Sequence, residues 1–227
     1  MPRGPRALVF DFDGVIADDE PLHLAAFQRA LAAEGVALSA EAYYARYLGF
    51  DDHDAVVEAL RDAGRPVTPD RVQALMAAKA GHFLDLVRDG VRIFPGVPEL
   101  VRAAAGRVPL AIASGALRRE IALILAQAGL TRAFTAIVSA EDVEEGKPSP
   151  AAFLAALERL RETVPDLAAA HCLVVEDSRA GVEAARRAGM RCLAVTNSYP
   201  AEALADADLV VTSLDEVTWE RLESIIY

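Results

Sequence analysis

Short apolar runs recur along the chain and alternate with longer segments of helical spacing. Each run has three or four residues and is followed by a polar residue. Runs without alternating polar positions are typical of strands that are covered on both faces of a sheet. The alternation predicts an α/β fold, a doubly wound parallel sheet with helices on both faces. The runs cover residues 7–10, 110–113, 136–138, 173–175, 192–195 and 209–211.

The helical segments between these runs carry start and stop signals. One segment ends at Gly129 and another at Gly189, residues that are common just past a helix end. We expect Ser149 to be an N-cap and Pro150 the first residue of a helix that runs through Leu160.

Residues from about 20 to 88 break this alternation, because none of them forms a convincing strand. Three helical patterns, at 21–33, 54–63 and 68–87, follow one another instead. We therefore expect an α/β catalytic core of residues 1–18 plus 90–227 and an inserted all-helical cap of residues 19–89. Such an insertion either only packs against the rest of the protein, without a role in function, or forms a lid over the strand ends.

The net charge of −11 limits the partners of the chain. Nucleic acids and anionic membranes attract basic surfaces, so we expect neither as a partner. No apolar run approaches the roughly 20 residues that cross a bilayer, and the first residues lack the apolar stretch of a signal peptide. Cys172 and Cys192 cannot build a disulfide framework, and we expect two buried thiols in a cytoplasmic protein.

Chemically active side chains gather where the predicted strands end. Ligands of open parallel sheets bind beyond the carboxyl ends of the strands. Four separate segments therefore bring acids, a hydroxyl and an ammonium to one edge. These residues are Asp11 and Asp13, Ser114 and Gly115, Lys147, and Glu176 and Asp177.

The acids of this set indicate a cation. Asp11 and Asp13 are two residues apart, which in extended backbone places both carboxylates on the same side. Adding Glu176 and Asp177 brings four acids to neighbouring strand ends, where they repel one another unless a cation or proton intervenes. Oxygen ligands and few histidines favour Mg²⁺ over zinc.

A carboxylate beside a metal-bound phosphoryl group can attack phosphorus and form an aspartyl phosphate. A second carboxylate two residues on can protonate the leaving oxygen and then activate water. In this scheme Lys147 and Ser114 hold the phosphoryl oxygens.

Four segments, in order, resemble the motifs of the haloacid dehalogenase superfamily, in its phosphatase and phosphomutase branch. Residues 11–15 (DFDGV) resemble the first motif, 112–115 (IASG) the second, 146–150 (GKPSP) the third and 174–178 (VVEDS) the fourth. The resemblance spans most of the chain and implies a Rossmann-like core with a helical cap and a monomer that acts on a small phosphate substrate.

The resemblance also implies individual roles. Asp11 matches the nucleophile and a magnesium ligand, and Asp13 the general acid/base, with its carbonyl on the metal. Ser114 and Lys147 match the phosphate binders. Asp177 matches the third magnesium ligand, and Glu176 a residue that contacts the metal through water.

Within that superfamily, the chain is similar to the subgroup of β-phosphoglucomutase and related sugar-phosphate phosphatases. Residues 18–23 (DDEPLH) resemble its hinge motif, with Asp19 where Ser or Thr is usual. Residues 47–52 offer no arginine where the mutase grips a distal phosphate. Lys79 aligns with a mutase cap lysine that faces the site, and the alternative is a solvated lysine on a helix face. His23 is either a packed histidine or a hinge or substrate contact.

These features predict a Mg²⁺-dependent phosphatase that hydrolyses a small phosphorylated metabolite, such as a sugar phosphate. A phosphomutase of the β-phosphoglucomutase type is the first alternative, and Asp19 together with the missing cap arginine argues against it. A non-catalytic phosphate-binding relative is the second, and the acids present in every motif argue against that.

Overall fold

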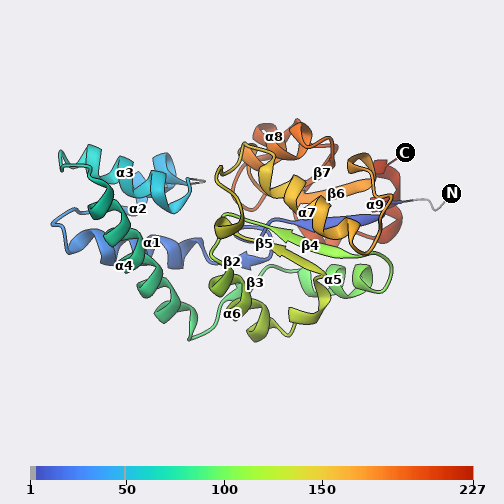
Figure 1. Cartoon of the computed structure of the whole chain (residues 1–227), viewed down its shortest axis with the longest axis horizontal. Coiled ribbons are helices and arrows are strands. Elements are labelled where there is room, and N and C mark those ends of the chain that lie inside the picture. Colours follow the sequence, from blue (N-terminus) through green and yellow to red (C-terminus); the bar gives the residue numbers. More distant parts are fainter. Residues whose placement is uncertain (1–3, 49, 227) are drawn as a thin grey trace. The chain divides into compact units, whose positions relative to one another are not determined.

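The computed structural model describes residues 4–48 and 50–226 and divides them into two compact units (Figure 1). The first unit contains the residues up to Asp18 together with those from Arg92 onward, and the second is Asp19–Val91. Within the described part of the chain, no helix is long and apolar enough to cross a bilayer.

The first unit is built on a six-stranded sheet in the order β5-β4-β1-β6-β7-β8, with every neighbouring pair parallel. The doubly wound parallel sheet that the sequence predicts is therefore confirmed. Strand β1 lies between β4 and β6, so the strand order reverses beside it, which is where ligands of open α/β sheets bind. The strands are β1 Ala7–Phe10, β4 Leu110–Ala113, β5 Ala136–Val138, β6 Cys172–Glu176, β7 Arg191–Val195 and β8 Leu209–Val211.

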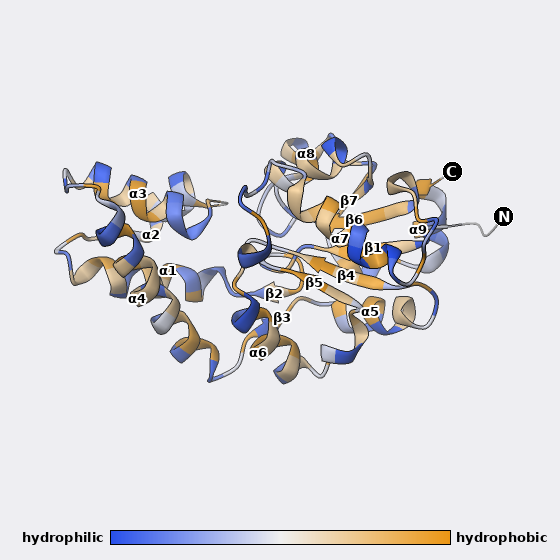
Figure 2. Ribbon diagram, viewed as in Figure 1, coloured by the Kyte–Doolittle hydropathy of each residue, from blue (hydrophilic) through white to orange (hydrophobic). Residues whose placement is uncertain are grey.

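The apolar runs form strands because both faces of the sheet are covered. Every residue of β1, β4 and β6 is buried, and Figure 2 shows the strands of the sheet as the most hydrophobic part of this unit. Helices α7 (Ala151–Arg161) and α8 (Arg179–Arg187) lie on one side of the sheet, and α5 (Val97–Ala105) and α6 (Arg118–Ala128) on the other (Figure 1). Helix α9 is Trp219–Ile226.

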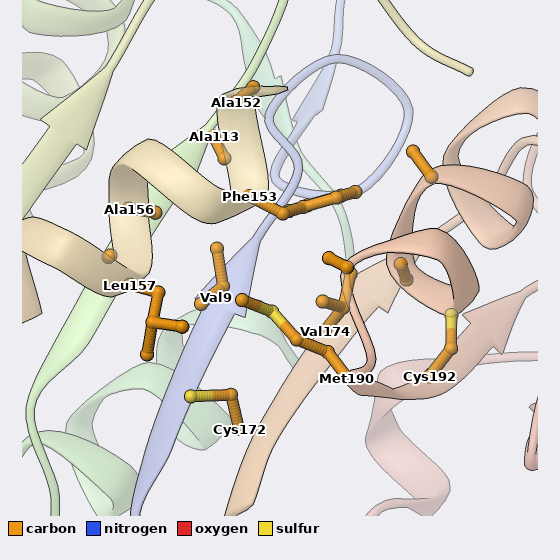
Figure 3. Packing of buried hydrophobic residues seen from close by; sticks show 14 of the residues in the cluster. Val9, Ala113, Ala152, Phe153, Ala156, Leu157, Cys172, Val174, Met190 and Cys192 are labelled. Atoms are coloured by element: carbon orange, nitrogen blue, oxygen red, sulfur yellow. The ribbon is translucent and has the colours of Figure 1, made fainter. Parts of the chain in front are cut away.

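Helix α7 packs on the sheet through one apolar stripe. Phe153 is fully buried and lies beside Val9 of β1 (Figure 3). Burying a phenylalanine side chain stabilises a fold by roughly 1.5–3 kcal/mol, so Phe153 is a main anchor of this helix. Cys172 and Cys192 belong to the same core as free, buried thiols, as expected from the sequence.

The second unit is helical and has a core of its own. Helices α1 and α4 pack along one another, and α3 packs on α4. Phe27, Leu60 and Leu75 are among the buried residues of this core. The helices are α1 Glu20–Ala32, α2 Ala40–Ala42, a π-helical turn Tyr43–Tyr47, α3 Asp52–Asp62 and α4 Pro69–Val87.

Three local features differ from the sequence-based expectation. A two-stranded antiparallel ribbon, β2 (Ala17–Asp18) with β3 (Arg92–Ile93), was not predicted, because two residues per strand are too few to show a pattern. Helix α7 has Pro150 as its N-cap, so it begins one residue later than expected. Helix α3 begins two residues earlier, because the Asp51 carboxylate accepts a hydrogen bond from the amide of Asp54 at 2.8 Å.

Candidate active site

Three acids converge at the carboxyl ends of β1 and β6, where the strand order reverses. Asp11 follows β1, and its amide donates to the carbonyl of Val175 at 2.9 Å, which fixes it beside β6. Asp11, Glu176 and Asp177 each place a carboxylate oxygen so that the three oxygens lie within 4.8 Å of one another. All three side chains are buried.

Lys147 connects two of these acids. Its Nζ lies 2.8 Å from Oδ1 of Asp11 and 2.7 Å from Oε1 of Glu176. The ammonium also lies 4.9 Å from the ring centroid of Phe153, a cation–π distance. Phe153, the residue that anchors α7 to the sheet, thus also contacts this lysine.

Glu176 is held by the turn that begins α8. Its Oε2 accepts hydrogen bonds from the amides of Asp177 at 2.8 Å and Ser178 at 2.9 Å, and from the Ser178 hydroxyl at 3.0 Å. A Cβ built on Gly181 would overlap the Glu176 carboxylate. Glycine at position 181 therefore leaves the space that this carboxylate occupies.

Asp177 is held by residues of two loops. Ser198, which follows β7, donates its hydroxyl hydrogen to Oδ2 of Asp177. Gly14 has a φ of +76°, and a Cβ on it would overlap the same carboxylate. Asn197 donates through Nδ2 to the carbonyl of Gly14 at 2.7 Å.

Burial and charge shift the pKa values of the cluster in opposite directions. Burial, together with Glu176 and Asp13, raises the pKa of Asp11 to about 8 despite Lys147. Burial, followed by the charges of Glu176 and Asp11, raises the pKa of Asp177 well above its usual range. Burial opposes ionisation of Glu176 too, but Lys147 and the two amides outweigh it and lower that pKa. The site therefore holds Glu176 as an anion, whereas burial and neighbouring charge oppose the ionisation of Asp11 and Asp177.

The remaining residues that the sequence places at this edge lie close by in the fold. Asp13 is half-buried and two residues beyond Asp11, near enough to raise the Asp11 pKa. Ser114 follows β4, which pairs with β1, and is 2% exposed, and its Oγ accepts a hydrogen bond from the amide of Ala116 at 3.0 Å. A Cβ on Gly115 would meet open space, so no steric requirement for glycine exists there.

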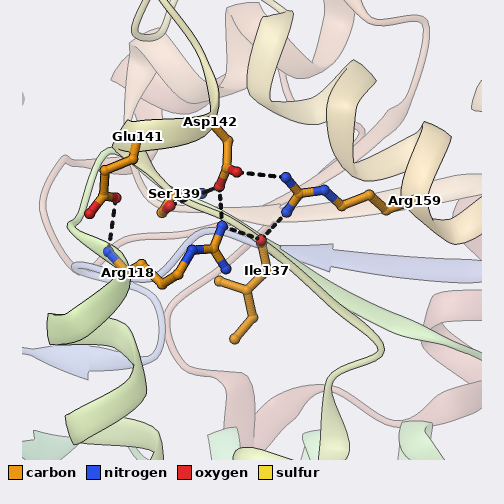
Figure 4. Close-up of polar contacts among 6 residues, drawn as sticks. All are labelled: Arg118, Ile137, Ser139, Glu141, Asp142 and Arg159. Atoms are coloured by element: carbon orange, nitrogen blue, oxygen red, sulfur yellow. Dashed lines mark hydrogen bonds and ion pairs between the residues drawn. The ribbon is translucent and has the colours of Figure 1, made fainter.

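A second polar cluster ties together the loops that carry Ser114 and Lys147 (Figure 4). Asp142 accepts hydrogen bonds at 2.8 Å from both the amide and the hydroxyl of Ser139. It also pairs with Arg118 of α6 and, at 2.6 Å, with Arg159 of α7. Although partial burial opposes ionisation, these partners hold the Asp142 pKa below its usual value. The loop that leads to Lys147 is thereby fastened to both neighbouring helices.

The two residues expected from the helical unit lie together inside that unit. Lys79 is 1% exposed, and its Nζ lies 2.6 Å from Oδ1 of Asp52 and 2.8 Å from Nδ1 of His23. The alternative of a solvated lysine is therefore wrong. His23 stacks on Phe83 at 4.1 Å between ring centroids, and burial followed by the Lys79 charge lowers its pKa well below 6.5. Of the segment 47–52, residue 49 lies outside the described residues.

Sequence reasoning missed Asn197, Ser198 and Asp142 as parts of this edge. Asn197 and Ser198 are the second and third residues after the predicted strand 192–195, and that position was the signal that could have found them. Their partners, a backbone carbonyl and an acid on another strand, become visible only in three dimensions.

The donor set is compatible with a metal site. It contains three carboxylates, which are hard oxygen ligands, and their repulsion is relieved by positive charge. The glycines at 14 and 181 leave these carboxylates room that a side chain would fill.

Comparisons with known proteins place this site in context. The sequence profile described as haloacid dehalogenase-like hydrolase matches residues 8–195. The chain is 32% identical to Protein CbbY of Rhodobacter capsulatus over 201 residues, 86% of each chain. It is also 32% identical to a phosphoglycolate phosphatase of Pectobacterium atrosepticum, over 86% of this chain and 81% of that protein.

A structural comparison also matches the chain to a CbbY protein. CbbY from Rhodobacter sphaeroides, in complex with xylulose-(1,5)-bisphosphate, matches with a TM-score of 0.85 and 27% identity. The match covers 96% of this chain and 99% of that one. The match therefore includes residues of both the α/β unit and the helical unit.

Proposed function

The chain belongs to the haloacid dehalogenase-like hydrolase family and is a phosphoric monoester hydrolase, and on that basis we propose that it is a Mg²⁺-dependent phosphatase acting through an aspartyl phosphate. Its substrate is a small phosphorylated metabolite, a sugar phosphate. The observation that carries the proposal is the contact of Lys147 with Asp11 and Glu176, beside the third acid Asp177.

Asp11, Asp13, Glu176 and Asp177 are the residues that would hold the ion. When bound, Mg²⁺ supplies the positive charge that keeps these buried carboxylates ionised and attracts phosphoryl oxygens. The closeness of the carboxylate oxygens of Asp11, Glu176 and Asp177, which lie within 4.8 Å of one another, supports this assignment, because such an arrangement offers several oxygen ligands to one cation.

The reaction then has two steps. A carboxylate oxygen of Asp11 attacks phosphorus, the bond from phosphorus to the ester oxygen breaks, and Asp13 gives its proton to that leaving oxygen. A water molecule next loses a proton to Asp13 and attacks phosphorus, and the bond from phosphorus to Asp11 breaks. Lys147 and the Ser114 hydroxyl bind the phosphoryl oxygens, where negative charge concentrates.

The test is a screen of phosphorylated metabolites with Mg²⁺, read as released phosphate. The panel includes xylulose 1,5-bisphosphate and phosphoglycolate, suggested by the relatives, together with p-nitrophenyl phosphate. Asp11→Asn is expected to abolish phosphate release while the fold survives. Asp166→Asn, which removes an exposed carboxylate paired with Arg6 at 2.7 Å, is the matched control and is expected to keep parental turnover.

Substantial activity of Asp11→Asn, or failure to trap an acyl phosphate on the parent protein, would refute the nucleophile. The same protein given β-glucose 1-phosphate and a bisphosphate activator separates hydrolysis from phosphoryl transfer. Free phosphate is the expected product, and glucose 6-phosphate would establish a mutase instead.

A further inference from the structure

The loop that follows β7 contacts both halves of the acid cluster. Asn197 donates to the carbonyl of Gly14, in the turn that carries Asp11 and Asp13, at 2.7 Å. Its neighbour Ser198 donates to Oδ2 of Asp177, at the end of β6. Two successive side chains thus connect the ends of two strands that carry the acids.

These contacts leave Asp177 little freedom to move. Asp177 is 3% exposed, so water has little room to replace the Ser198 hydroxyl as a donor. On its other side the carboxylate lies against Gly14, whose missing Cβ would overlap it and would also lie 3.1 Å from Oγ of Ser198. The loop itself is fastened to the next strand, because the amide of Thr196 donates to the carbonyl of Val211 at 3.0 Å.

We propose that Ser198 and Asn197 are positioning residues for cation binding, which hold Asp177 and the 11–14 turn in the arrangement that a divalent cation requires. The inference rests on the proposed function, since it assumes that the acid cluster takes up Mg²⁺. It assigns neither residue a contact with substrate or with the ion.

The energetic reason is repulsion among the acids. A divalent cation requires Asp11, Glu176 and Asp177 as anions, and as anions they repel one another because their oxygens lie within 4.8 Å. Without the hydrogen bond from Ser198, we expect Asp177 to relieve that repulsion by turning away from the other two acids. Removing residues that orient metal ligands typically weakens metal affinity by about 10- to 100-fold. We expect that loss for Ser198→Ala, and a loss of about tenfold for Asn197→Ala, which acts through the backbone of the turn.

Calorimetric titration of the full chain with Mg²⁺, without substrate, measures this directly. Ser198→Ala is expected to raise the Kd for Mg²⁺ by at least tenfold, whereas Ser198→Thr keeps the hydroxyl and restores affinity. Ser213→Ala is the matched control, because it removes a hydroxyl after the neighbouring strand β8 that bonds the amide of Asp215 and no acid of the cluster. Turnover at saturating Mg²⁺ should recover in Ser198→Ala, which a general structural defect would prevent.

The outcomes separate the inference from the proposed function. A parent that binds Mg²⁺ and hydrolyses phosphate esters, while a folded Ser198→Ala binds Mg²⁺ within twofold of it, overturns the inference alone. A parent that binds no Mg²⁺ overturns both. If Ser198→Ala does not fold, Asn197→Ala decides, and an unchanged Kd in that variant contradicts the role of the loop.

Discussion

Replacing Lys147 with methionine tests whether the acid cluster depends on the buried ammonium. The side chain of Lys147 is 13% exposed and that of Glu176 is fully buried, so Lys147→Met leaves a buried carboxylate without its partner. The protein then responds by protonating that carboxyl. For a group with an ordinary pKa of 4.5, protonation at pH 7 costs about 3.4 kcal/mol, since each pH unit corresponds to about 1.4 kcal/mol. We therefore expect Lys147→Met to lose about 3 kcal/mol of unfolding free energy at pH 7, in the range measured for broken buried pairs.

The stability deficit of Lys147→Met should become smaller as the pH falls. Lys147 lowers the folded-state pKa of Glu176, so the stabilisation is present above pH 4.5 and is lost as the pH falls through the folded-state value. The variant lacks this contribution, and its deficit should shrink to about 0.7 kcal/mol at pH 5.

Equilibrium urea unfolding with a metal chelator present provides the measurement. The single tryptophan, Trp219, lies in α9 of the α/β unit, so its fluorescence follows that unit. The control is the double variant Lys147→Met with Glu176→Gln, which removes both charges and should be clearly more stable than Lys147→Met alone. A deficit under 1 kcal/mol at pH 7, or one that stays constant down to pH 5, would refute the reasoning.

Three further substitutions test other contacts. Gly181→Ala forces a methyl group onto the Glu176 carboxylate and should lower kcat/KM at least tenfold, measured by phosphate release. Phe153→Ala leaves a cavity under Lys147 and should cost about 3–5 kcal/mol in urea unfolding. Gly81→Ala, at an open position within α4, should instead stabilise the protein by about 0.5–1 kcal/mol, seen as a higher melting temperature.

Each of these has a contradicting result. Parental kcat/KM in Gly181→Ala would show that Glu176 can move without consequence. A loss under 1 kcal/mol in Phe153→Ala would mean that α7 does not depend on this anchor. Destabilisation by Gly81→Ala would show that the space beside α4 is occupied.

The sheet was predictable because its strands are buried on both faces and therefore appear as unbroken apolar runs. The convergence of Asp11, Lys147, Glu176 and Asp177 followed from one rule, that carboxyl ends of parallel strands share an edge. The ribbon of β2 and β3 was not predictable, because four residues give no periodicity. The surroundings of Lys79 were also hidden, since its partners Asp52 and His23 lie far from it in sequence and are brought together only by the packing of three helices.

The position of β1 in the middle of the sheet affects how the chain folds during its synthesis. Leu8 pairs with Leu110 and with Leu173, so the strand that precedes Asp11 leaves the ribosome long before either neighbour has been synthesised. Contacts between residues distant in sequence form slowly. During that interval the apolar segment of β1 is exposed and can aggregate with other apolar surfaces. The segment 19–91, whose contacts are comparatively local, is available to fold meanwhile, and the reactive edge is completed only when the last third of the chain emerges.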